Sequence, residues 1–539
     1  MNNPQTRTTH RWWVIGLCLA FGAALSVALG QDIFWDTRNY HLYNAWAFLH
    51  DRYAMDITAA GLQSYFNPLP DLPYFLLATG PLNAWPRLLA AVQGLWFGAL
   101  AYLVLCIAQR LAALQQRRFG AADVCAALIG ATGTMAVSQA GSTTNEIQLA
   151  VFLLLGLYVL MPLLSATAPP RPLARALWGG LCCGLAAGLK PTAIVYPPAM
   201  ALALLIAMGA GRKLAWQAAM AYATGALAAF VLAYGYWGWH LYQATGNPIF
   251  PMFNQVFHSP LTVSGGGTDG RFLPRNLWQW LFYPFFWIGK QRNVVTESLF
   301  ADARYALAML AILALLAARL IRGPSSVQAN AGTRILAIFA AVGYVLWMAL
   351  FSILRYATPI EALTGLLMLC AVHAWWPRLW EKKPALRTAG FVLLLLVILG
   401  NTTYPNWWRG AYARHAIEAD IGEVELNSLV ILAGSPDAYL APLFPQAENI
   451  QFVGLTWFTR ASQDRGLWTL TRQRLGEHTG AFYLVRRDDP GTADELALLK
   501  DMLPQYRATD CRPIHSNMEI SRGGKDMSQG LSLCRLQKG

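Results

Sequence analysis

About eleven apolar segments, each long enough to cross a membrane as a helix, recur along the chain. They lie near residues 12–30, 86–108, 121–140, 147–164, 174–189, 192–210, 214–235, 304–320, 335–354, 360–376 and 387–403. A transmembrane helix needs roughly 20 apolar residues to span a hydrocarbon core about 30 Å thick. The pattern therefore predicts a polytopic α-helical membrane protein with about eleven transmembrane helices.

Basic residues collect in alternate connections between these segments. They are Arg110, Arg117, Arg118, Arg171, Arg175, Arg212, Lys213, Arg319, Arg322, Arg334, Arg378, Lys382, Lys383 and Arg387, with Arg7 and Arg11 ahead of the first segment. Lys and Arg concentrate in cytoplasmic loops, so this pattern predicts a cytoplasmic N-terminus. An odd number of spans then places the C-terminus outside the cytoplasm.

Three long polar regions fall on the predicted outer side. They are a first outer loop over 31–85, a long outer loop over 236–303, and the region 404–539. In the first loop, aromatic residues such as Tyr40 and Tyr43 recur at three- and four-residue spacing, which predicts an amphipathic helix lying in the membrane interface. Loops of this length are uncommon unless they carry function.

The region 404–539 has a different pattern from the membrane segments. Short β-rich runs ("NSLVILAG", "NIQFVGL", "AFYLVRR") alternate with stretches of helical periodicity. This alternation predicts a small extracytoplasmic α/β domain. Cys511 and Cys534 both fall in it, and we expect them to form a disulfide in an oxidising compartment. The alternative is two free thiols in a cytoplasmic domain, which would require an even number of spans.

Composition agrees with a membrane protein and argues against nucleic-acid binding. The 539 residues are 56% hydrophobic and only 13% charged, about half the charged fraction of a typical soluble domain. The formal net charge is +13, but the basic residues lie in short loops rather than in one patch with aromatic residues. The six other cysteines lie in or beside apolar segments without metal-ligand spacing, so we interpret them as small buried hydrophobes.

Two acidic residues stand at the outer ends of apolar segments. Asp36 follows the first segment in "FWDTRNYHLYNAWAFLHDRYAMD", and Glu146 opens another in "TTNEIQLA". Each has a structural explanation: Asp favours helix N-caps, and Glu in a first turn suits the helix dipole. Two carboxylates on one side of a membrane are also what general-base chemistry or a metal ion would use. The nearby residues His41, Asp51, Asp56 and Asp71 are interpreted as scaffold, loop or capping residues.

Several Lys and Arg residues lie on the predicted outer side, where the preference of basic residues for cytoplasmic loops does not explain them. Lys190 lies in "GLKPTA" and Arg355 in "SILRYATPIEAL", while Arg271, Arg275 and Lys290 lie in the long outer loop. Singly, each has a loop or snorkelling explanation. Together they could form a cationic site for a lipid phosphate, because Arg binds phosphate bidentately and Lys acts as a point charge.

The segments "WDTRNYHLYNAWAFLHDRYAMDI", "NPLPDLPYFLL", "GLKPTA", "TGNPIFPMFN" and "RYATPIEAL" together resemble the C-type (GT-C) membrane glycosyltransferases, which use polyprenyl-phosphate-linked sugars. The resemblance covers the membrane part, roughly residues 12–403, and implies a glycosyltransferase core over residues 1–403. The matching segments are similar to those of aminoarabinose transferases and protein mannosyltransferases. It implies a catalytic base at Asp36 and a second acid at Glu146, where such members usually have Asp. It also implies donor-phosphate or substrate contacts at Lys190, Arg355 and the adjoining Tyr356.

The resemblance further implies an enzyme of a bacterial-type inner (cytoplasmic) membrane, acting on its outer face. Its partners would be a polyprenyl-phosphate-sugar donor, a lipid, glycan or protein acceptor, and membrane lipids. No DxD-type pair of metal-binding acids is present in the first outer loop, so we predict no metal ligand. The sequence leaves open whether the enzyme uses a divalent metal.

Other classes of function predict different sequence features. A transporter or flippase predicts ionisable residues in the middle of the membrane and repeat symmetry. An outer-face polysaccharide polymerase or ligase would rely more on arginine and histidine, and a non-catalytic assembly or sensory protein would only display its C-terminal domain. Few charges fall inside the apolar segments, so the sequence favours a membrane glycosyltransferase over these alternatives.

Overall fold

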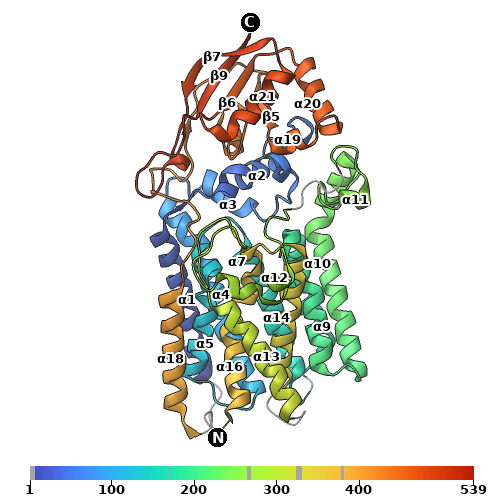
Figure 1. The fold of residues 1–539 in the computed structure, drawn as a ribbon, viewed down its shortest axis with the longest axis vertical. Coiled ribbons are helices and arrows are strands. Elements are labelled where there is room, and N and C mark those ends of the chain that lie inside the picture. The colour runs from blue at the N-terminus through green and yellow to red at the C-terminus, as the bar shows by residue number, and fades with distance from the viewer. Residues whose placement is uncertain (1–5, 168, 264–268, 323–329, 378–381) are drawn as a thin grey trace.

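The computed structural model describes residues 6–167, 169–263, 269–322, 330–377 and 382–539. A bundle of long helices forms one end of the molecule, and a sheet domain containing the C-terminus forms the other (Figure 1). The first outer loop lies between the bundle and the sheet domain. Arg378 is outside the described residues, as are the side chains of Arg7, Arg11 and Arg322.

The bundle is built from helices that run along its long axis (Figure 1). They are α1 (Thr6–Leu29), α4 (Pro86–Leu114), α5 (Ala121–Ala131), α6 (Thr134–Ser138), α7 (Glu146–Leu160), α8 (Pro172–Leu189), α9 (Tyr196–Met208), α10 (Lys213–Thr245), α13 (Arg304–Arg322), α14 (Ala331–Leu350), α15 (Thr358–Glu361), α16 (Thr364–Trp375) and α18 (Pro384–Asn401). Within the described residues, nine helical segments are long and apolar enough to cross a membrane, or ten if a pair bent by 44° between Glu361 and Thr364 counts as one. The predicted polytopic helical fold is therefore confirmed.

The predicted single helix over 121–140 is interrupted. Helix α5 ends at Ala131 and α6 begins at Thr134. The buried carboxylate of Glu361 accepts hydrogen bonds from the backbone N–H groups of Met135 (3.1 Å) and Ala136 (2.9 Å) at the start of α6. A carboxylate at a helix N-terminus satisfies N–H groups that have no partner within the helix. The apolar run length could not reveal this break, because the group that caps α6 comes from a distant segment.

Helix α10 also differs from the prediction, since it ends at Thr245 rather than near residue 235. Its added turns bury Trp237 and Leu241 in a small cluster with Tyr53 and Tyr65 of the first outer loop. The long outer loop therefore begins later than predicted. Its described residues include the short helices α11 (Asn254–Phe257) and α12 (Leu277–Phe282) and the 3₁₀ helix η6 (Tyr283–Trp287).

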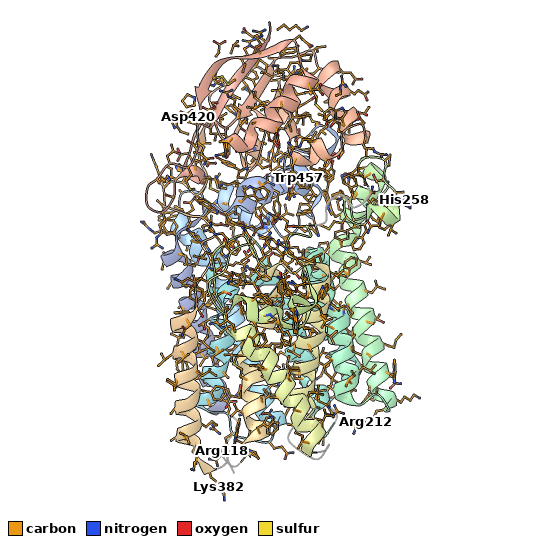
Figure 2. The ribbon with its side chains drawn as sticks, viewed as in Figure 1. Arg118, Arg212, His258, Lys382, Asp420 and Trp457 are labelled. Carbon is orange, nitrogen blue, oxygen red and sulfur yellow. A yellow bond between two sulfur atoms is a disulfide. The ribbon has the colours of Figure 1, made fainter. Side chains whose placement is uncertain are left out.

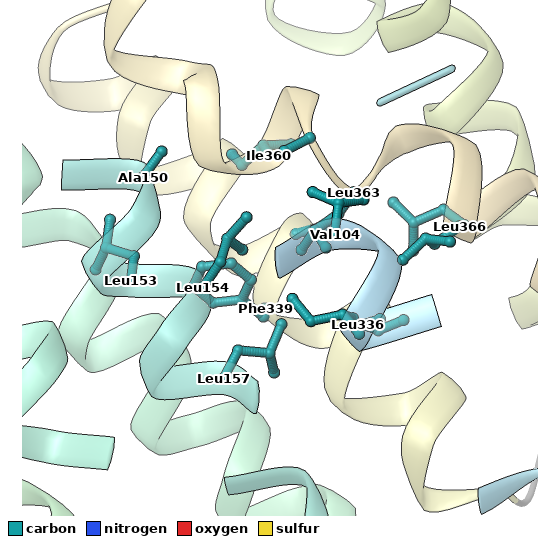
Figure 3. Close-up of a cluster of buried hydrophobic side chains, with 14 of the residues drawn as sticks. Val104, Ala150, Leu153, Leu154, Leu157, Leu336, Phe339, Ile360, Leu363 and Leu366 are labelled. Carbon is teal, nitrogen blue, oxygen red and sulfur yellow. The ribbon is translucent and has the colours of Figure 1, made fainter. Parts of the chain in front are cut away.

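Apolar side chains from several helices meet in the centre of the bundle (Figure 3). Val104 of α4, Leu157 of α7, and Leu336 and Phe339 of α14 are all buried there. Elsewhere, close helix packing depends on small residues. A Cβ on Gly184 of α8 would lie 2.0 Å from the backbone oxygen of Ala226 on α10, so only glycine permits that approach.

The first outer loop folds into several short elements. They are β1 (Gln31–Asp32), the π-helix η1 (Thr37–His41), α2 (Leu42–Leu49), the 3₁₀ helices η2 (Arg52–Ala54) and η3 (Gly61–Tyr65), and α3 (Leu72–Thr79). The predicted helix is present, but its aromatic rings do not face outward. Tyr40, Tyr43 and Trp46 are buried, and Trp46 packs edge-on against Phe452 of the sheet domain. The aromatic stripe therefore forms a core with the sheet domain, which a periodicity argument cannot distinguish from contact with lipid.

The C-terminal region is the predicted α/β domain. Its elements are β2 (Arg409–Gly410), β3 (Ala419–Asp420), β4 (Leu429–Ala433), β5 (Gln451–Leu455), α19 (Trp457–Ala461), α20 (Gly466–Glu477), β6 (Phe482–Arg486), α21 (Ala493–Met502), β7 (Tyr506–Pro513), β8 (His515–Ser516) and β9 (Ser532–Lys538). The five-stranded sheet has the order β5-β4-β6-β9-β7. Strands β5, β4 and β6 are parallel, whereas β9 is antiparallel to both neighbours.

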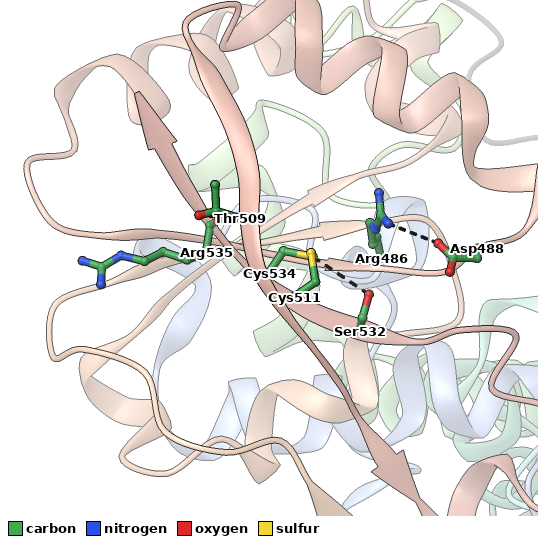
Figure 4. The surroundings of a disulfide bond; sticks show 7 residues. All are labelled: Arg486, Asp488, Thr509, Cys511, Ser532, Cys534 and Arg535. Carbon is green, nitrogen blue, oxygen red and sulfur yellow. Dashed lines mark hydrogen bonds and ion pairs between the residues drawn. A yellow bond between two sulfur atoms is a disulfide. The ribbon is translucent and has the colours of Figure 1, made fainter. Parts of the chain in front are cut away.

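The predicted disulfide between Cys511 and Cys534 is confirmed and joins β7 to β9 (Figure 4). Strand β4 alternates between two apolar clusters, as expected for a sheet with both faces covered. Leu429 and Ile431 pack with residues of α20 and α21. Val430 and Leu432 pack with the first outer loop, which therefore serves as the second covering layer of the sheet.

Candidate functional site

Asp36 lies at the start of η1, directly after α1 and β1 leave the bundle. Its carboxylate Oδ2 is 3.0 Å from Nη1 of Arg355, and Asp36 is buried. The Tyr40 hydroxyl donates a hydrogen bond of 3.3 Å to the same oxygen. Burial, and then the charge of Asp36, raises the pKa of Tyr40 well above its ordinary value, so the phenol keeps its proton. The Asp36 side chain makes no capping hydrogen bond to η1, so the capping interpretation does not account for it.

Glu146 is the first residue of α7 and forms a second ion pair. Its Oε1 is 2.6 Å from Nζ of Lys190, which also donates to the backbone oxygen of Thr144 at 2.8 Å. The same Oε1 is 3.9 Å from Nε of Arg355. Arg355 therefore lies between the two carboxylates, and the four charged side chains predicted from separate segments converge at one place.

The aromatic ring of Tyr356 lies beside both cations of this cluster. Its centroid is 5.8 Å from Nζ of Lys190 and 5.5 Å from the guanidinium carbon of Arg355. The cluster has two negative and two positive charges, so the buried carboxylates of Asp36 and Glu146 are balanced by the partly exposed Lys190 and Arg355. Among the described residues, Glu146 Oε2 and Arg355 Nε are buried without a hydrogen-bond partner, which leaves an acceptor and a donor available to a ligand.

A narrow cavity adjoins Glu146 on the bundle side. Glu146, Leu149 and Leu153 of α7 line it together with Thr192, Ala193, Tyr196, Tyr356 and Pro359. Its volume of about 10 Å³ is close to the space of one water molecule. The cavity extends from the charged cluster to apolar side chains of the bundle.

Two networks hold the acidic residues in place. Asp32 accepts hydrogen bonds from the Thr37 hydroxyl (2.9 Å) and from the Thr143 backbone N–H (2.8 Å), and so connects η1 to the segment before Glu146. Asp71 is 2.6 Å from Nδ1 of His41 and accepts a hydrogen bond of 2.8 Å from Asn145. Asp32, Asp71 and His41 therefore act as structural anchors around the cluster.

In the described part of the chain, the long-loop cations predicted for the site do not pair with Asp36 or Glu146. Arg271 pairs with Asp269 (2.8 Å) and Glu297 (3.0 Å) and is 65% exposed. The side chains of Arg275 and Lys290 are exposed, and within the described residues neither forms an ion pair with Asp36 or Glu146. A donor-binding role for these three residues remains a prediction, whereas Lys190, Arg355 and Tyr356 are in contact with the acidic pair.

The charged cluster does not fit a divalent metal ion. Within the described residues, no group of three or more His, Cys, Asp or Glu side chains is placed to hold a metal. Asp36 and Glu146 are already neutralised by Arg355 and Lys190. Metal sites for hard cations need several oxygen ligands free of such partners. We therefore assign no step to a metal.

Sequence reasoning found the four charged residues because each interrupts an otherwise apolar or turn-rich segment. It missed Asp32, whose only signal is its position four residues before Asp36. It also missed Arg38 and Glu519, which form a buried ion pair of 2.6 Å between the first outer loop and the sheet domain. That partnership joins residues 481 positions apart, and no local pattern marks it.

Known protein structures similar to this chain are membrane glycosyltransferases. The crystal structure of the Archaeoglobus fulgidus oligosaccharyltransferase in the apo form aligns over 92% of this chain and 73% of its own chain, with a TM-score of 0.51 and 13% identity. This chain shares the overall fold of that oligosaccharyltransferase. The likeness extends over the bundle and the sheet domain, and at this identity it concerns the fold alone.

Two further structures align with lower TM-scores. The same oligosaccharyltransferase in complex with Zn and sulfate aligns over 87% of this chain and 68% of its own, with a TM-score of 0.45 and 13% identity. The mycobacterial arabinofuranosyltransferase AftD aligns over 97% of this chain and 40% of its own, with a TM-score of 0.44 and 13% identity. No protein-family model and no curated protein sequence matches the chain.

Proposed function

We propose that this protein is a membrane glycosyltransferase that moves a sugar from a polyprenyl-phosphate donor to a lipid, glycan or protein acceptor. The observation that carries the proposal is the convergence of Asp36, Glu146, Lys190 and Arg355 at the end of the bundle nearest the sheet domain. An acid pair that can accept a proton and a cation pair that can bind a phosphate are the two requirements of this reaction. The shared fold with an oligosaccharyltransferase supports the same class of chemistry.

In this proposal Asp36 is the general base. It takes the proton from the acceptor nucleophile, which attacks the anomeric carbon of the donor sugar. The bond between that carbon and the phosphate oxygen breaks, and the polyprenyl phosphate leaves with the bonding electrons. Glu146 orients the acceptor through its unpartnered Oε2. Proton transfer by a positioned carboxylate contributes about 10²- to 10⁴-fold to the rate.

Arg355 and Lys190 stabilise the departing phosphate. In the resting protein their charges are matched by the two carboxylates. A donor phosphate would compete for Arg355, whose Nε has no hydrogen-bond partner among the described residues, and would loosen the contact of Arg355 with Asp36. Donor binding would thereby free the Asp36 carboxylate to act as a base. The adjoining cavity is too small for a polyprenyl chain, so we expect Tyr356 to move when the donor binds.

We further propose that the site faces the outer side of a bacterial-type inner membrane, with the N-terminus in the cytoplasm. The basic connections support this orientation. Arg118, Arg212 and Lys382 lie at the end of the bundle opposite the sheet domain, whereas Asp420 and Trp457 lie in the sheet domain (Figure 2). Basic residues favour the cytoplasmic side, which leaves the site and the disulfide outside the cytoplasm.

The test is sugar transfer by purified variants in lipid nanodiscs with a polyprenyl-phosphate-linked sugar. We expect Asp36→Asn to lower kcat by about 10²-fold or more, because the amide cannot accept the proton. Glu146→Gln should lower kcat as well and should also weaken acceptor binding. The matched control is Asp51→Asn, which changes an exposed acid of the same loop at a positive φ that Asn adopts readily. Full activity in both site variants, with correct folding, would disprove the mechanism.

A further inference from the structure

A second buried cluster of charges connects the sheet domain to the helix that follows Asp36. Glu519 Oε2 is 2.6 Å from Nη1 of Arg38, and its Oε1 is 2.6 Å from Nη2 of Arg487. Arg487 Nη2 is also 2.6 Å from Oδ1 of Asp437, and the Tyr439 hydroxyl donates to Glu519 Oε1 at 2.9 Å. All five side chains are buried. Two positive and two negative charges therefore balance one another inside the protein.

Two of these residues lie just beyond the carboxyl ends of neighbouring strands, and a third contacts them from a 3₁₀ helix. Asp437 follows β4, Arg487 follows β6, and Glu519 lies on the 3₁₀ helix η12 (Asn517–Glu519). The chain passes from β4 to β5 on one side and then returns to β6 on the other side of β4. In open α/β sheets the crevice at such a reversal, outside the carboxyl ends of the strands, is where ligands bind. Here Arg38 of the first outer loop occupies that position.

The side chains that meet at this crevice are buried from solvent. Burial raises the pKa of Asp437 above its ordinary value even though the Arg487 guanidinium favours the charged form. In such a medium an ion pair is held firmly, because its partners have no water to replace them. Arg38 is two residues from Asp36 and lies on η1, so a fixed Arg38 limits where the start of that helix can move.

We propose that the sheet domain positions the catalytic loop: Glu519 holds Arg38, and this contact keeps Asp36 at Arg355. The proposal rests on the function proposed above. It makes Arg38 and Glu519 positioning residues, since neither touches the reacting atoms. It also gives the sheet domain a role in catalysis, as a module whose strand-end crevice binds a segment of its own chain.

The rest of the loop has separate attachments to the sheet domain. Arg52 donates to the backbone oxygen of Glu448 at 2.9 Å, and Asp56 accepts from the backbone N–H of Phe452 at 2.9 Å. Ile57 forms a parallel bridge with Val453. Loss of the Arg38 contact should therefore loosen η1 while the remainder of the loop stays docked.

The test compares full-length variants in nanodiscs by kinetics and by amide hydrogen exchange of residues 34–45. We use Glu519→Gln and the double variant Arg38→Met/Glu519→Gln. The double variant leaves Arg487 balanced by Asp437, so it should fold even if the single variant does not. We expect kcat to fall by about 10²-fold, with the KM for the donor within about twofold, because a small misplacement of a catalytic group has effects of that size. Exchange over 34–45 should become about tenfold faster or more.

Arg38→Lys serves as the conservative variant and Arg460→Gln as the matched control. Arg38→Lys keeps the charge and should recover much of the lost kcat and protection. Arg460 pairs with Asp494 at an exposed site of the same domain, so its loss should change neither measurement. Unchanged exchange over 34–45 in the double variant would overturn the proposal, as would a change in KM with kcat intact.

The two readouts separate this proposal from the proposed function. If the wild type transfers no sugar, the proposed function fails, and hydrogen exchange alone decides whether Glu519 and Arg38 fix the start of η1. If the wild type is active and the double variant matches it in both readouts, the positioning role fails and the proposed function stands.

Discussion

At the scale of single residues, the site consists of charges that neutralise one another. Asp36 and Glu146 would each be costly to bury alone, and Arg355 and Lys190 remove that cost. In the proposed mechanism, the same pairing keeps the carboxylates from acting as bases until the donor phosphate takes their partners. The resting geometry therefore couples donor binding to activation of Asp36 in the proposed mechanism.

Removal of Arg355 tests this coupling. We expect Arg355→Gln to lower kcat by about 10²-fold, because one preorganised group that stabilises developing charge has an effect of that size. The kcat of Arg355→Lys should lie between those of the wild type and Arg355→Gln, since lysine keeps the positive charge but lacks the planar set of donors. Arg460→Gln is the control and should leave kcat within about twofold, because Arg460 pairs with Asp494 at an exposed site of the sheet domain. Equal losses at Arg460 and Arg355 would contradict the assignment.

Metal removal gives a second prediction at this scale. We expect sugar transfer to proceed at an unchanged rate after dialysis against EDTA, because Arg355 and Lys190 supply the positive charge at the site. The measurement is the initial rate with EDTA and after addition of Mg²⁺ or Mn²⁺ in excess. A rate that is lost with EDTA and restored by one metal would show that the carboxylates exchange their cationic partners for that ion.

At the scale of elements, the break between α5 and α6 depends on one glycine. A Cβ on Gly133 would lie 2.0 Å from the carboxyl group of Glu361, the group that caps α6. Glu361 is the last residue of α15. The 3₁₀ helix directly before α15, η8 (Leu354–Ala357), contains Arg355. The capping contact thus connects the broken helix to the segment that presents a cation to the site.

Gly133→Ala should therefore destabilise the protein locally and reduce activity. We expect the free energy of unfolding to fall by about 1–3 kcal/mol, the usual cost of overpacking a filled interior. Gly390→Ala is the control, because no heavy atom lies within 4 Å of its Cβ position and alanine is the better helix former. The measurement is thermal unfolding in one detergent, with a lower midpoint only for Gly133→Ala. Equal midpoints would show that Glu361 moves aside at little cost.

At the scale of the whole molecule, the sheet domain and the first outer loop form one structural unit. They share an apolar core, a two-stranded pairing of β1 with β2, and the Arg38–Glu519 ion pair. The division at residues 403/404 suggested by composition marks where the membrane helices end. It does not mark an independent folding unit, because one face of the sheet is covered by the loop that begins at residue 31.

Orientation in the membrane is testable with single cysteines. Asp420→Cys and Arg118→Cys place exposed thiols at opposite ends of the molecule. In intact cells a membrane-impermeant maleimide should label Asp420→Cys, whereas Arg118→Cys should react only after permeabilisation, because basic loops remain cytoplasmic. Labelling of the wild-type protein is subtracted to account for its six free cysteines. The reverse labelling would place the site on the cytoplasmic side and exclude the proposed topology.

The amino-acid sequence by itself determined the membrane bundle, the α/β nature of the C-terminal region, and which charged residues were candidates for the site, and it favoured a bond between Cys511 and Cys534 that the structure confirmed. These follow from local physics: apolar run length, periodicity, and the cost of placing a charge beside lipid. Only the tertiary structure decided that Lys190 and Arg355 pair with Asp36 and Glu146, whereas Arg271 pairs with Asp269 and Glu297. It also decided the break before α6, the burial of the aromatic stripe and the Arg38–Glu519 contact. Each of these depends on partners far apart in the chain, whose proximity no local pattern specifies.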